Sequence, residues 1–208
     1  MAKKDIGLDQ AYGLKTPADS VRLYRDWSDS YDSGFARRMD YRLPYVVADV
    51  FLDLAGPGDA PVLDAGAGTG LVAERLDGRA VDALDISPDM LAVAAGKGLY
   101  RATLVADMTA TLPIDDAAYG GVVSAGTFTH GHVGPDAFDE LLRVARPGAL
   151  FVLSINSEAF VKLGFGPALE VLGSRIEGLH YREVRNYGDA ADPDHRDDTA
   201  QIATFRKR

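Results

Sequence analysis

Three aspartates in the central part of the chain stand where short apolar segments end. These are Asp64, Asp85 and Asp107, and each segment is followed by a turn and a helical pattern. In an open α/β sheet, the carboxyl ends of parallel strands meet at the edge that binds ligands. Carboxylates at that edge can accept hydrogen bonds from ribose hydroxyls and from amines. The pattern therefore predicts a site for a nucleoside with a cationic tail.

The first of these aspartates opens a glycine-rich turn, Asp64-x-Gly66-x-Gly68-x-Gly70. Glycine permits a sharp turn and lets a ligand approach the main chain closely. The turn lacks the Gly-Lys-Ser/Thr ending of a phosphate-binding P-loop. It also lacks the third glycine of the dinucleotide fingerprint, because that position is Leu71. A purely structural turn is the alternative, but three acids in register favour ligand binding.

The three acids also indicate which ligand the turn would bind. Asp64 would repel a pyrophosphate but suits an amino group beside a sulfonium. Asp85 comes about twenty residues after Gly66, where this fold places an acid on ribose hydroxyls. Asp107 could accept a hydrogen bond from an adenine amine. An NAD-type oxidoreductase is accordingly disfavoured.

The composition limits which partners and which cellular compartment we expect for this protein. The 208 residues are 47% hydrophobic, carry a net charge of −9 and include no cysteine. An acidic surface repels phosphate backbones, so a nucleic-acid partner is not expected. The amino-terminal residues lack the apolar core of a secretory signal, and no apolar run is long enough to span a bilayer. We expect a cytoplasmic protein with no membrane partner.

Short apolar segments alternate with helical patterns from residue 61 onward. Strands are expected at 61–65, 81–86, 103–106, 121–125 and 149–155, with helices at 71–76, from Pro88 and from Pro135. Near-continuous apolar strands are typical of parallel sheets buried on both faces. A helix at 167–176 and strands at 181–184 and 201–205 follow, with a polar loop at 188–199. The predicted fold is α/β: a doubly wound, mostly parallel sheet with an antiparallel C-terminal hairpin.

The motifs, taken as a set, resemble those of class I S-adenosylmethionine-dependent methyltransferases. DAGAGTG at 64–70 matches their first motif and ALDISPDML at 83–91 their second, while VADM, SAGTF and RPGALFVLS at 105–108, 124–128 and 146–154 match later ones. This similarity covers residues 44–156. It implies a Rossmann-like methyltransferase fold, with S-adenosylmethionine as methyl donor and S-adenosylhomocysteine as product.

The resemblance also implies roles for individual residues. Gly66, Gly68 and Gly70 would line the methionine moiety, with Asp64 near its amino group. Asp85 would hold the ribose, Met90 would pack on the adenine, and Asp107 with Met108 would read the adenine edge. The remaining cofactor-binding residues expected from the second and fourth motifs are Ile86 and Ser124.

Aromatic residues precede the sheet at helical spacing. Tyr24-x-x-Trp27-x-x-x-Tyr31-Asp32, followed by Tyr41-Arg42-Leu43-Pro44, resembles the Williams–Beuren-region methyltransferase-like proteins. Aromatics at such spacing are more often core than pocket, but the resemblance implies a lid that brings Tyr24, Trp27 and Tyr31 to the cofactor. We therefore divide the chain into a tail and helical cap at 1–44 and an S-adenosylmethionine-binding domain at 45–208.

Two histidines, His130 and His132, follow the fourth predicted strand at the ligand-binding edge. A solvated surface loop is one interpretation, and a general base or substrate contact is another. His130 is the catalytic candidate. A metal site is not expected, because His-x-His has no third ligand nearby, and the acidic segment 192–198 lacks the glycine and closing glutamate of a calcium loop.

The sequence thus predicts a methyltransferase that moves a methyl group from S-adenosylmethionine to an oxygen or nitrogen of a small molecule. A regulatory protein that binds S-adenosylmethionine without transferring its methyl group is an alternative, and so is a methyltransferase with a protein acceptor. The oligomeric state does not follow from the sequence.

Overall fold

A computed structural model describes residues 10–208 except 12, 15 and 77. Seven strands form one sheet in the order β3-β2-β1-β4-β5-β7-β6. Their bounds are β1 Val62–Ala65, β2 Val81–Asp85, β3 Ala102–Val105, β4 Tyr119–Phe128, β5 Ala145–Asn156, β6 Ile176–Arg185 and β7 Thr199–Lys207. The first five strands are parallel, whereas β7 runs antiparallel to β5 and to β6. The predicted fold class is confirmed.

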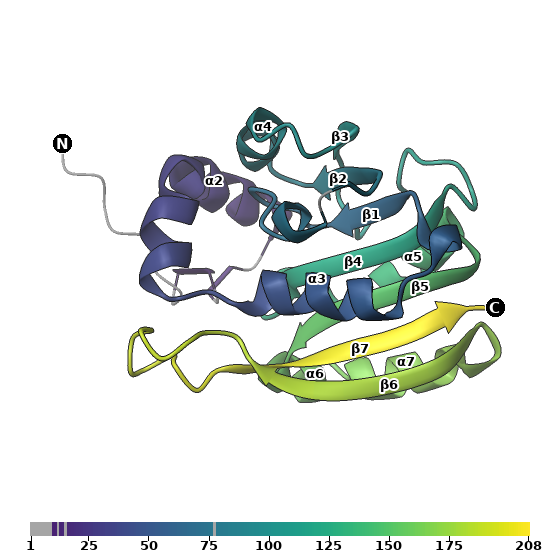
Figure 1. The fold of residues 1–208 in the computed structure, drawn as a ribbon. Helices are drawn as coiled ribbons and strands as arrows, with labels where there is room; N and C mark the ends of the chain where they lie inside the picture. Colours follow the sequence, from purple (N-terminus) through teal and green to yellow (C-terminus); the bar gives the residue numbers. More distant parts are fainter. Residues whose placement is uncertain (1–9, 12, 15, 77) are drawn as a thin grey trace.

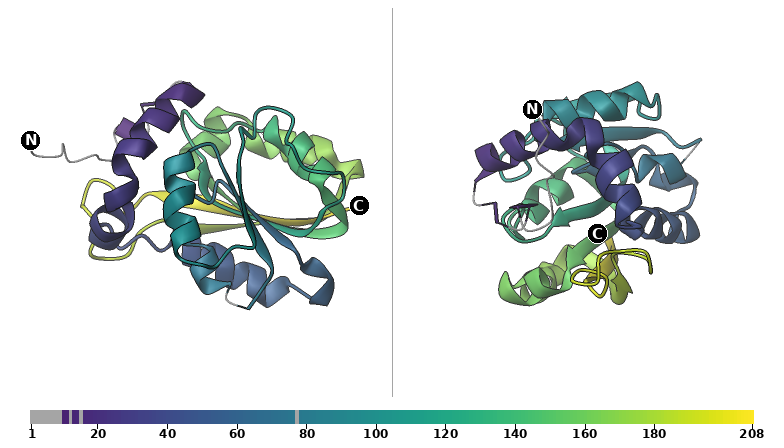
Figure 2. Two further views of the ribbon diagram at one scale, coloured as in Figure 1. Left: turned by 90° about the horizontal axis from the view of Figure 1, so that it is seen from above. Right: turned by 90° about the vertical axis from the view of Figure 1, so that its left-hand side faces the viewer.

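Helices cover both faces of the sheet (Figures 1 and 2). On one face lie α3 (Leu43–Leu54), the short helical turn Ala73–Arg75 and α4 (Pro88–Gly96). On the other lie α5 (Ala137–Val144), α6 (Ser157–Lys162) and α7 (Phe165–Val171). The residues of β1 alternate between these layers: Val62 packs with α3, and Leu63 packs with α5. This alternation explains why central strands such as β1 and β5 are apolar along most of their length.

The N-terminal segment packs at the end of the sheet toward which β1 and β2 point in Figure 1. It comprises α2 (Pro17–Trp27), a single 3-10 turn at Ser28–Ser30 and a π-helical segment at Tyr31–Ala36. The Thr16 side chain caps α2 by accepting a hydrogen bond from the Asp19 backbone N–H at 3.2 Å. Buried residues of the segment, Trp27 and Phe35 among them, form one cluster with Leu71, Met90 and Tyr187 of the sheet domain.

The N-terminal segment and the C-terminal hairpin are joined directly. Tyr41 and Tyr187 form an isolated antiparallel bridge, and the Asn186 carbonyl accepts hydrogen bonds from the backbone N–H groups of Arg42 and Leu43 at 3.0 and 3.2 Å. Because α3 begins at Leu43, the boundary that the sequence placed after residue 44 falls inside its first turn.

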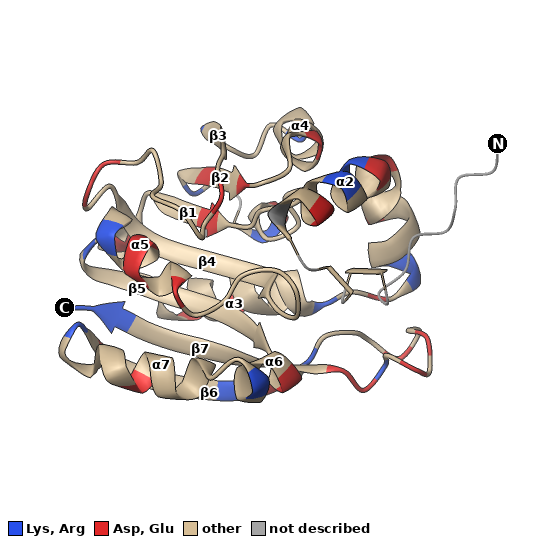
Figure 3. Cartoon of the chain, turned by 180° about the vertical axis from the view of Figure 1, so that it is seen from behind, with Lys and Arg blue, Asp and Glu red and all other residues tan. Residues whose placement is uncertain are grey.

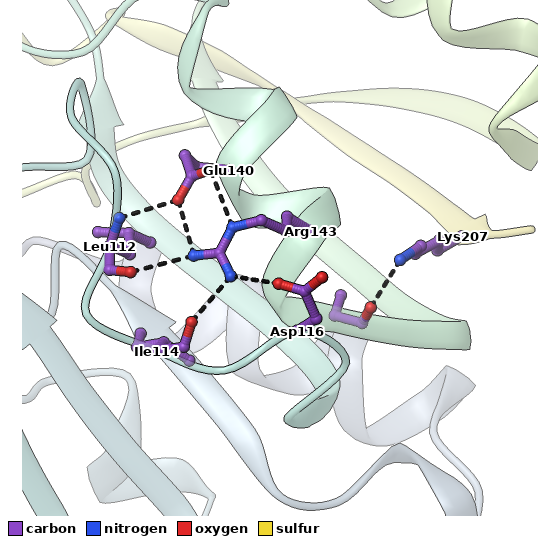
Figure 4. A network of polar contacts seen from close by, with 7 residues as sticks. Leu112, Ile114, Asp116, Glu140, Arg143 and Lys207 are labelled. Atoms are coloured by element: carbon purple, nitrogen blue, oxygen red, sulfur yellow. Dashed lines mark hydrogen bonds and ion pairs between the residues drawn. The ribbon is translucent and has the colours of Figure 1, made fainter.

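A guanidinium clamp fixes the loop between β3 and β4 (Figure 4). Arg143 of α5 donates to the carbonyls of Leu112 and Ile114 at 3.0 and 2.8 Å and pairs with Asp116 at 2.6 Å. Glu140 accepts from the Leu112 N–H at 2.8 Å. The clamp holds the chain that leads into β4, beside the amino ends of β4 and β5, which is the edge of the sheet opposite the ligand-binding edge.

Several helices and strands differ in extent from those predicted from the sequence. Only Ala73–Arg75 is helical in the segment predicted as a helix at 71–76, because a run of turns extends from Gly68 to Val72. The helix predicted to continue to residue 176 ends at Val171, and Ile176 already belongs to β6. Both α6 and most of β6 escaped prediction. Most residues of β6 are exposed or half-buried, which leaves little hydrophobic alternation to recognise.

Charged residues lie mainly outside the sheet core. Figure 3 shows acidic residues along the loop between β6 and β7 and basic residues at the end of β7. Every helix in the described part of the chain is too short or too polar to cross a membrane.

Candidate active site

A cavity opens at the ligand-binding edge, where the glycine loop and the ends of β2 and β4 face the N-terminal segment. We call it the main cavity. Ten of the residues predicted to act at the site contribute to its wall: Gly66, Gly68, Asp85, Ile86, Met90, Asp107, Met108, Tyr24 and Tyr31 line it directly, and Trp27 lies behind Tyr24, with ring centroids 6.0 Å apart.

The glycine loop is shaped by contacts inside the protein as well as by open space. Gly66 has a φ of 76°, and a Cβ added there would overlap the Thr127 side chain. Gly68 has a φ of 54°, and an added Cβ would meet nothing within 4 Å. The loop therefore presses against β4 at Gly66 and presents open backbone to the cavity at Gly68.

Asp85 is held in place by the loop that it faces. Its carboxylate accepts hydrogen bonds from the backbone N–H groups of Gly68 and Ser87, both at 2.8 Å. Ser87 in turn caps α4 by accepting from the Met90 N–H at 3.3 Å. Burial raises the pKa of Asp85, while these backbone donors act in the opposite direction. Each carboxylate oxygen keeps acceptor capacity for a further donor in the cavity.

Asp107 lies after β3 on the same wall. One of its oxygens accepts from the Thr109 backbone N–H at 2.8 Å and from the Thr109 hydroxyl at 2.7 Å. Met108 next to it is 6% exposed and packs into the core cluster behind the sheet.

Besides His130, three predicted residues lie outside the wall of the main cavity. Asp64 is fully buried and accepts a hydrogen bond from the Tyr100 hydroxyl at 2.6 Å. Gly70 has a φ of 91° and faces the ring of Tyr100 rather than the cavity. The Ser124 hydroxyl donates to the Ala65 carbonyl at 2.6 Å, which joins β4 to β1.

Burial makes the Asp64 carboxyl a weaker acid than an ordinary aspartate. It raises the pKa of the carboxyl from 3.8 to about 7, because a charged group is poorly solvated there, although the Tyr100 hydroxyl opposes the shift. The Oδ1 atom of Asp64 has no hydrogen-bond partner among the described residues. The geometry thus places Asp64 beneath the glycine loop, as its support.

The structure brings His132, rather than His130, to the main cavity. His132 Nδ1 lies 2.8 Å from the His130 carbonyl, and His132 Nε2 lies 2.8 Å from the Tyr24 hydroxyl. Since a carbonyl only accepts, Nδ1 carries the proton and the Tyr24 hydroxyl donates to Nε2. Burial lowers the pKa of His132, which favours this neutral imidazole.

His130 points toward α6 instead. Its Nε2 lies 3.8 Å from the Glu158 carboxylate. The chain turns at His130–Gly131, where Gly131 has a φ of 71°, so the two histidines face different surroundings, and the sequence offered no means of choosing between them. Among the described residues, no group of three histidines, aspartates or glutamates is close enough to hold a metal ion.

A second hollow continues from the main cavity toward β5, and we call it the recess. Five residues line both spaces: Tyr24, Tyr31, Tyr41, Gly126 and His132. The recess is completed by residues from distant parts of the chain, including Trp27, Thr129, Ser154, Asn186 and Tyr187. Of these, Thr129, Asn186 and Tyr187 stand outside every motif, because only the folded chain brings them to this site.

Comparisons with known proteins agree with this geometry. A family model described as "Methyltransferase domain" matches residues 63–153. The Homo sapiens methyltransferase-like protein 27 is 32% identical over 173 residues, covering 80% of this chain and 69% of that protein. The chain belongs to the class I S-adenosylmethionine-dependent methyltransferases.

Two further relatives of this methyltransferase differ in their acceptors. The malonyl-[acyl-carrier protein] O-methyltransferase of a Marinomonas species is 35% identical over 63% of this chain, which spans about half (49%) of that relative. The Burkholderia thailandensis 1,6-didemethyltoxoflavin-N1-methyltransferase, solved with its acceptor and S-adenosylhomocysteine, has a TM-score of 0.63 at 19% identity and covers 94% of this chain and 92% of its own.

The residues of the main cavity fit the cofactor of this methyltransferase family. Asp85 is fixed by two backbone N–H groups and retains acceptor capacity toward the cavity, as binding of ribose hydroxyls requires. The open backbone at Gly68 leaves room for close approach of the donor. Met90 and Ile86 supply an apolar surface beside Asp85 for a planar base.

Proposed function

We propose that this methyltransferase transfers the methyl group of S-adenosylmethionine to an oxygen or nitrogen of a small-molecule acceptor bound in the recess. The observation that carries the proposal is the Tyr24–His132 pair, which borders both the main cavity and the recess. A proton acceptor at that boundary lies between the space for the donor and the space for the acceptor.

The cofactor-binding residues have the following roles in this proposal. Asp85 binds the ribose, Met90 and Ile86 pack on the adenine, and Asp107 with Met108 reads the adenine edge. Gly66 and Gly68 face the methionine moiety, whereas Asp64, Gly70 and Ser124 support the loop from below. Tyr24, Tyr31 and Trp27 close the site from the N-terminal side.

The bound cofactor supplies an electrophilic methyl carbon on a sulfonium, so the protein's tasks are positioning and proton removal. The acceptor's hydroxyl or amine donates to the Tyr24 oxygen, and the Tyr24 proton passes to His132 Nε2. The backbone carbonyl of His130 holds the Nδ1 proton and stabilises the imidazolium that results. The pair thus acts as a general base in place of His130, the residue expected from the sequence.

Substitution of this pair tests the proposal. We expect Tyr24→Phe and His132→Gln to bind S-adenosylhomocysteine about as tightly as the parent and to lose roughly 10²- to 10⁴-fold in turnover. The measurements are calorimetry with S-adenosylhomocysteine and transfer of labelled methyl groups to a metabolite panel. His180→Gln, at an exposed position in β6, is the matched control and should be unaffected.

Two results would overturn this assignment. Loss of turnover in His130→Gln with normal turnover in His132→Gln would restore His130 as the base. Binding of S-adenosylmethionine without turnover of any acceptor would favour a regulatory protein.

The narrower likeness to the Williams–Beuren-region methyltransferase-like proteins, based on the Tyr24–Tyr31 and Tyr41–Pro44 segments, is part of the same proposal.

A further inference from the structure

The recess beyond the Tyr24–His132 pair has walls made largely of aromatic rings. Tyr24, Trp27, Tyr31, Phe35, Tyr41 and Tyr187 contribute them. The rings hold one another in place: Trp27 meets Phe35 edge-on at 4.9 Å between centroids, and Tyr41 lies 5.4 Å from Tyr187. Such a wall offers ring faces and edges to a flat π-system, with which aromatic side chains interact favourably.

The recess also carries no formal charge in the part of the chain that the structure describes. Its lining there includes no aspartate, glutamate, lysine or arginine. Burial lowers the pKa of its one histidine, His132, which favours the neutral imidazole. A carboxylate or phosphate placed in such a recess would lose its hydration without gaining a cation, which costs several kcal/mol.

Two polar atoms of the recess are buried without partners in the described structure. These are the Thr129 hydroxyl and the Asn186 Oδ1 atom, on residues that are 7% and 5% exposed. The neighbouring polar side chains are engaged: Ser154 accepts from the Gly126 N–H at 2.9 Å, and Asn156 caps α6. Buried polar atoms are ordinarily hydrogen-bonded, so these two are available to a bound molecule.

We infer that the acceptor is a neutral, planar aromatic or heteroaromatic molecule whose polar edge hydrogen-bonds to Thr129 and Asn186. This inference rests on the proposed function, because it names the class of molecule that the proposed acceptor site takes. The rings of the recess hold the faces of the acceptor. Asn186 Oδ1 accepts from an N–H or O–H on its edge, and the Thr129 hydroxyl donates to or accepts from a neighbouring atom.

Direct binding tests the class of acceptor. The protein is saturated with S-adenosylhomocysteine and titrated with umbelliferone in its neutral form, with its carboxylate derivative and with cyclohexanediol. We expect at least tenfold tighter binding of umbelliferone than of the charged or the non-planar probe. Equal or tighter binding of either comparison probe overturns the inference, and so does failure of umbelliferone, hydroxyquinoline and hydroxyindole all to bind.

Two variants test the polar edge. Thr129→Val and Asn186→Leu remove the unpartnered atoms while roughly keeping volume. We expect each to weaken the binding of the best planar probe at least tenfold, with S-adenosylhomocysteine affinity unchanged and the unfolding temperature equal or higher, since no internal hydrogen bond is lost. Ser154→Ala is the matched control and should lower the unfolding temperature, because its hydroxyl has a backbone partner. Unchanged probe binding in both recess variants contradicts the assignment.

Failure of the inference is distinguishable from failure of the proposed function. If S-adenosylhomocysteine does not bind, the proposed function fails before any acceptor is tested. If it binds and the protein methylates an anionic or aliphatic molecule, as an acceptor of the malonyl kind would require, the proposed function holds and the neutral planar class is wrong.

Discussion

The Thr69 hydroxyl donates a hydrogen bond to the Asp32 carboxylate at 2.5 Å and thereby joins the glycine loop to the N-terminal segment. Lys97 at the end of α4 strengthens the connection, because its ammonium lies 2.6 Å from Asp32 and 2.6 Å from Glu74. The segment that covers the site is thus fastened to the loop that would hold the donor. Movement of one is expected to affect the other.

Removing this connection should loosen the cover without unfolding the domain. We expect Thr69→Val to increase amide exchange in residues 16–42 and to weaken S-adenosylmethionine binding about three- to tenfold, the effect of losing one hydrogen bond of ordinary strength. Exchange mass spectrometry and calorimetry measure the two effects. Thr103→Val in the exposed strand β3 is the control.

The same segment contains the only tryptophan, which reports on whether the cover behaves as a lid. Trp27 is 4% exposed and already packed against neighbouring rings. If the segment closes over the donor, Trp27 fluorescence should change on cofactor binding, and exchange at 16–42 should slow more than in the sheet. If Trp27 fluorescence does not change, and amide exchange at 16–42 is already slow before the cofactor binds, the segment is a permanent part of the core.

Asp85 should contribute strongly to donor affinity. Asp85→Ala removes the proposed partner of the ribose and the acceptor for the Gly68 N–H. We expect S-adenosylmethionine binding to weaken by about 2 kcal/mol, roughly thirtyfold. Asp115→Ala, in the exposed loop after β3, should bind normally. Unaltered affinity in Asp85→Ala, measured by calorimetry, would remove the ribose assignment.

Asp64 should make stability depend on pH in a direction opposite to that of most carboxylates. Burial raises its pKa from 3.8 to about 7, so the folded state binds its proton more tightly than the unfolded state. Between these values the free energy of unfolding should fall as pH rises, by roughly 1 kcal/mol per pH unit from this group.

The Asp64→Asn variant isolates this contribution. It keeps an acceptor for the Tyr100 hydroxyl but has no proton to lose, so its stability should fall less than that of the parent between pH 5 and 7. Denaturant unfolding at several pH values provides the comparison. Parallel pH profiles for the two proteins would mean that Asp64 is ionised in the folded state.

Gly66 and Gly68 should respond differently to the same substitution. Both have positive φ, so alanine strains the backbone at each by about 1 kcal/mol. Only Gly66→Ala also drives a methyl group into the Thr127 side chain. We expect Gly66→Ala to be the less stable variant in thermal unfolding. Equal loss of stability in the two variants would contradict the close packing of the loop on β4.

The order of the elements and most residues that line the main cavity could be predicted, because their signals are local. The glycine loop, Asp85 and Asp107 stand at strand ends in register, and hydrophobic runs mark β1, β2 and β5. The recess could not be predicted, because its residues are joined only by contacts between distant parts of the chain. Tyr24 and His132 are 108 positions apart, and nothing in either segment specifies the other.

The sequence did not show which motif residues face the cavity and which support the glycine loop. Asp64 and Gly70 lie within the same motif as Gly68, and Ser124 lies within the motif at 124–128, yet their side chains or α-carbons face Tyr100 and β1. A motif specifies which residue types occur together. Which of these motif residues face a ligand depends on the twist of each strand and on Tyr100, the large residue packed behind the glycine loop.

The bridge between Tyr41 and Tyr187 joins the N-terminal part of the recess to the C-terminal hairpin. The walls of the main cavity come from residues up to 133, whereas the recess needs Asn186 and Tyr187 and the hairpin that carries them. The two spaces therefore depend on different lengths of the chain: a chain that ends before residue 186 keeps every residue that lines the main cavity but lacks part of the recess wall.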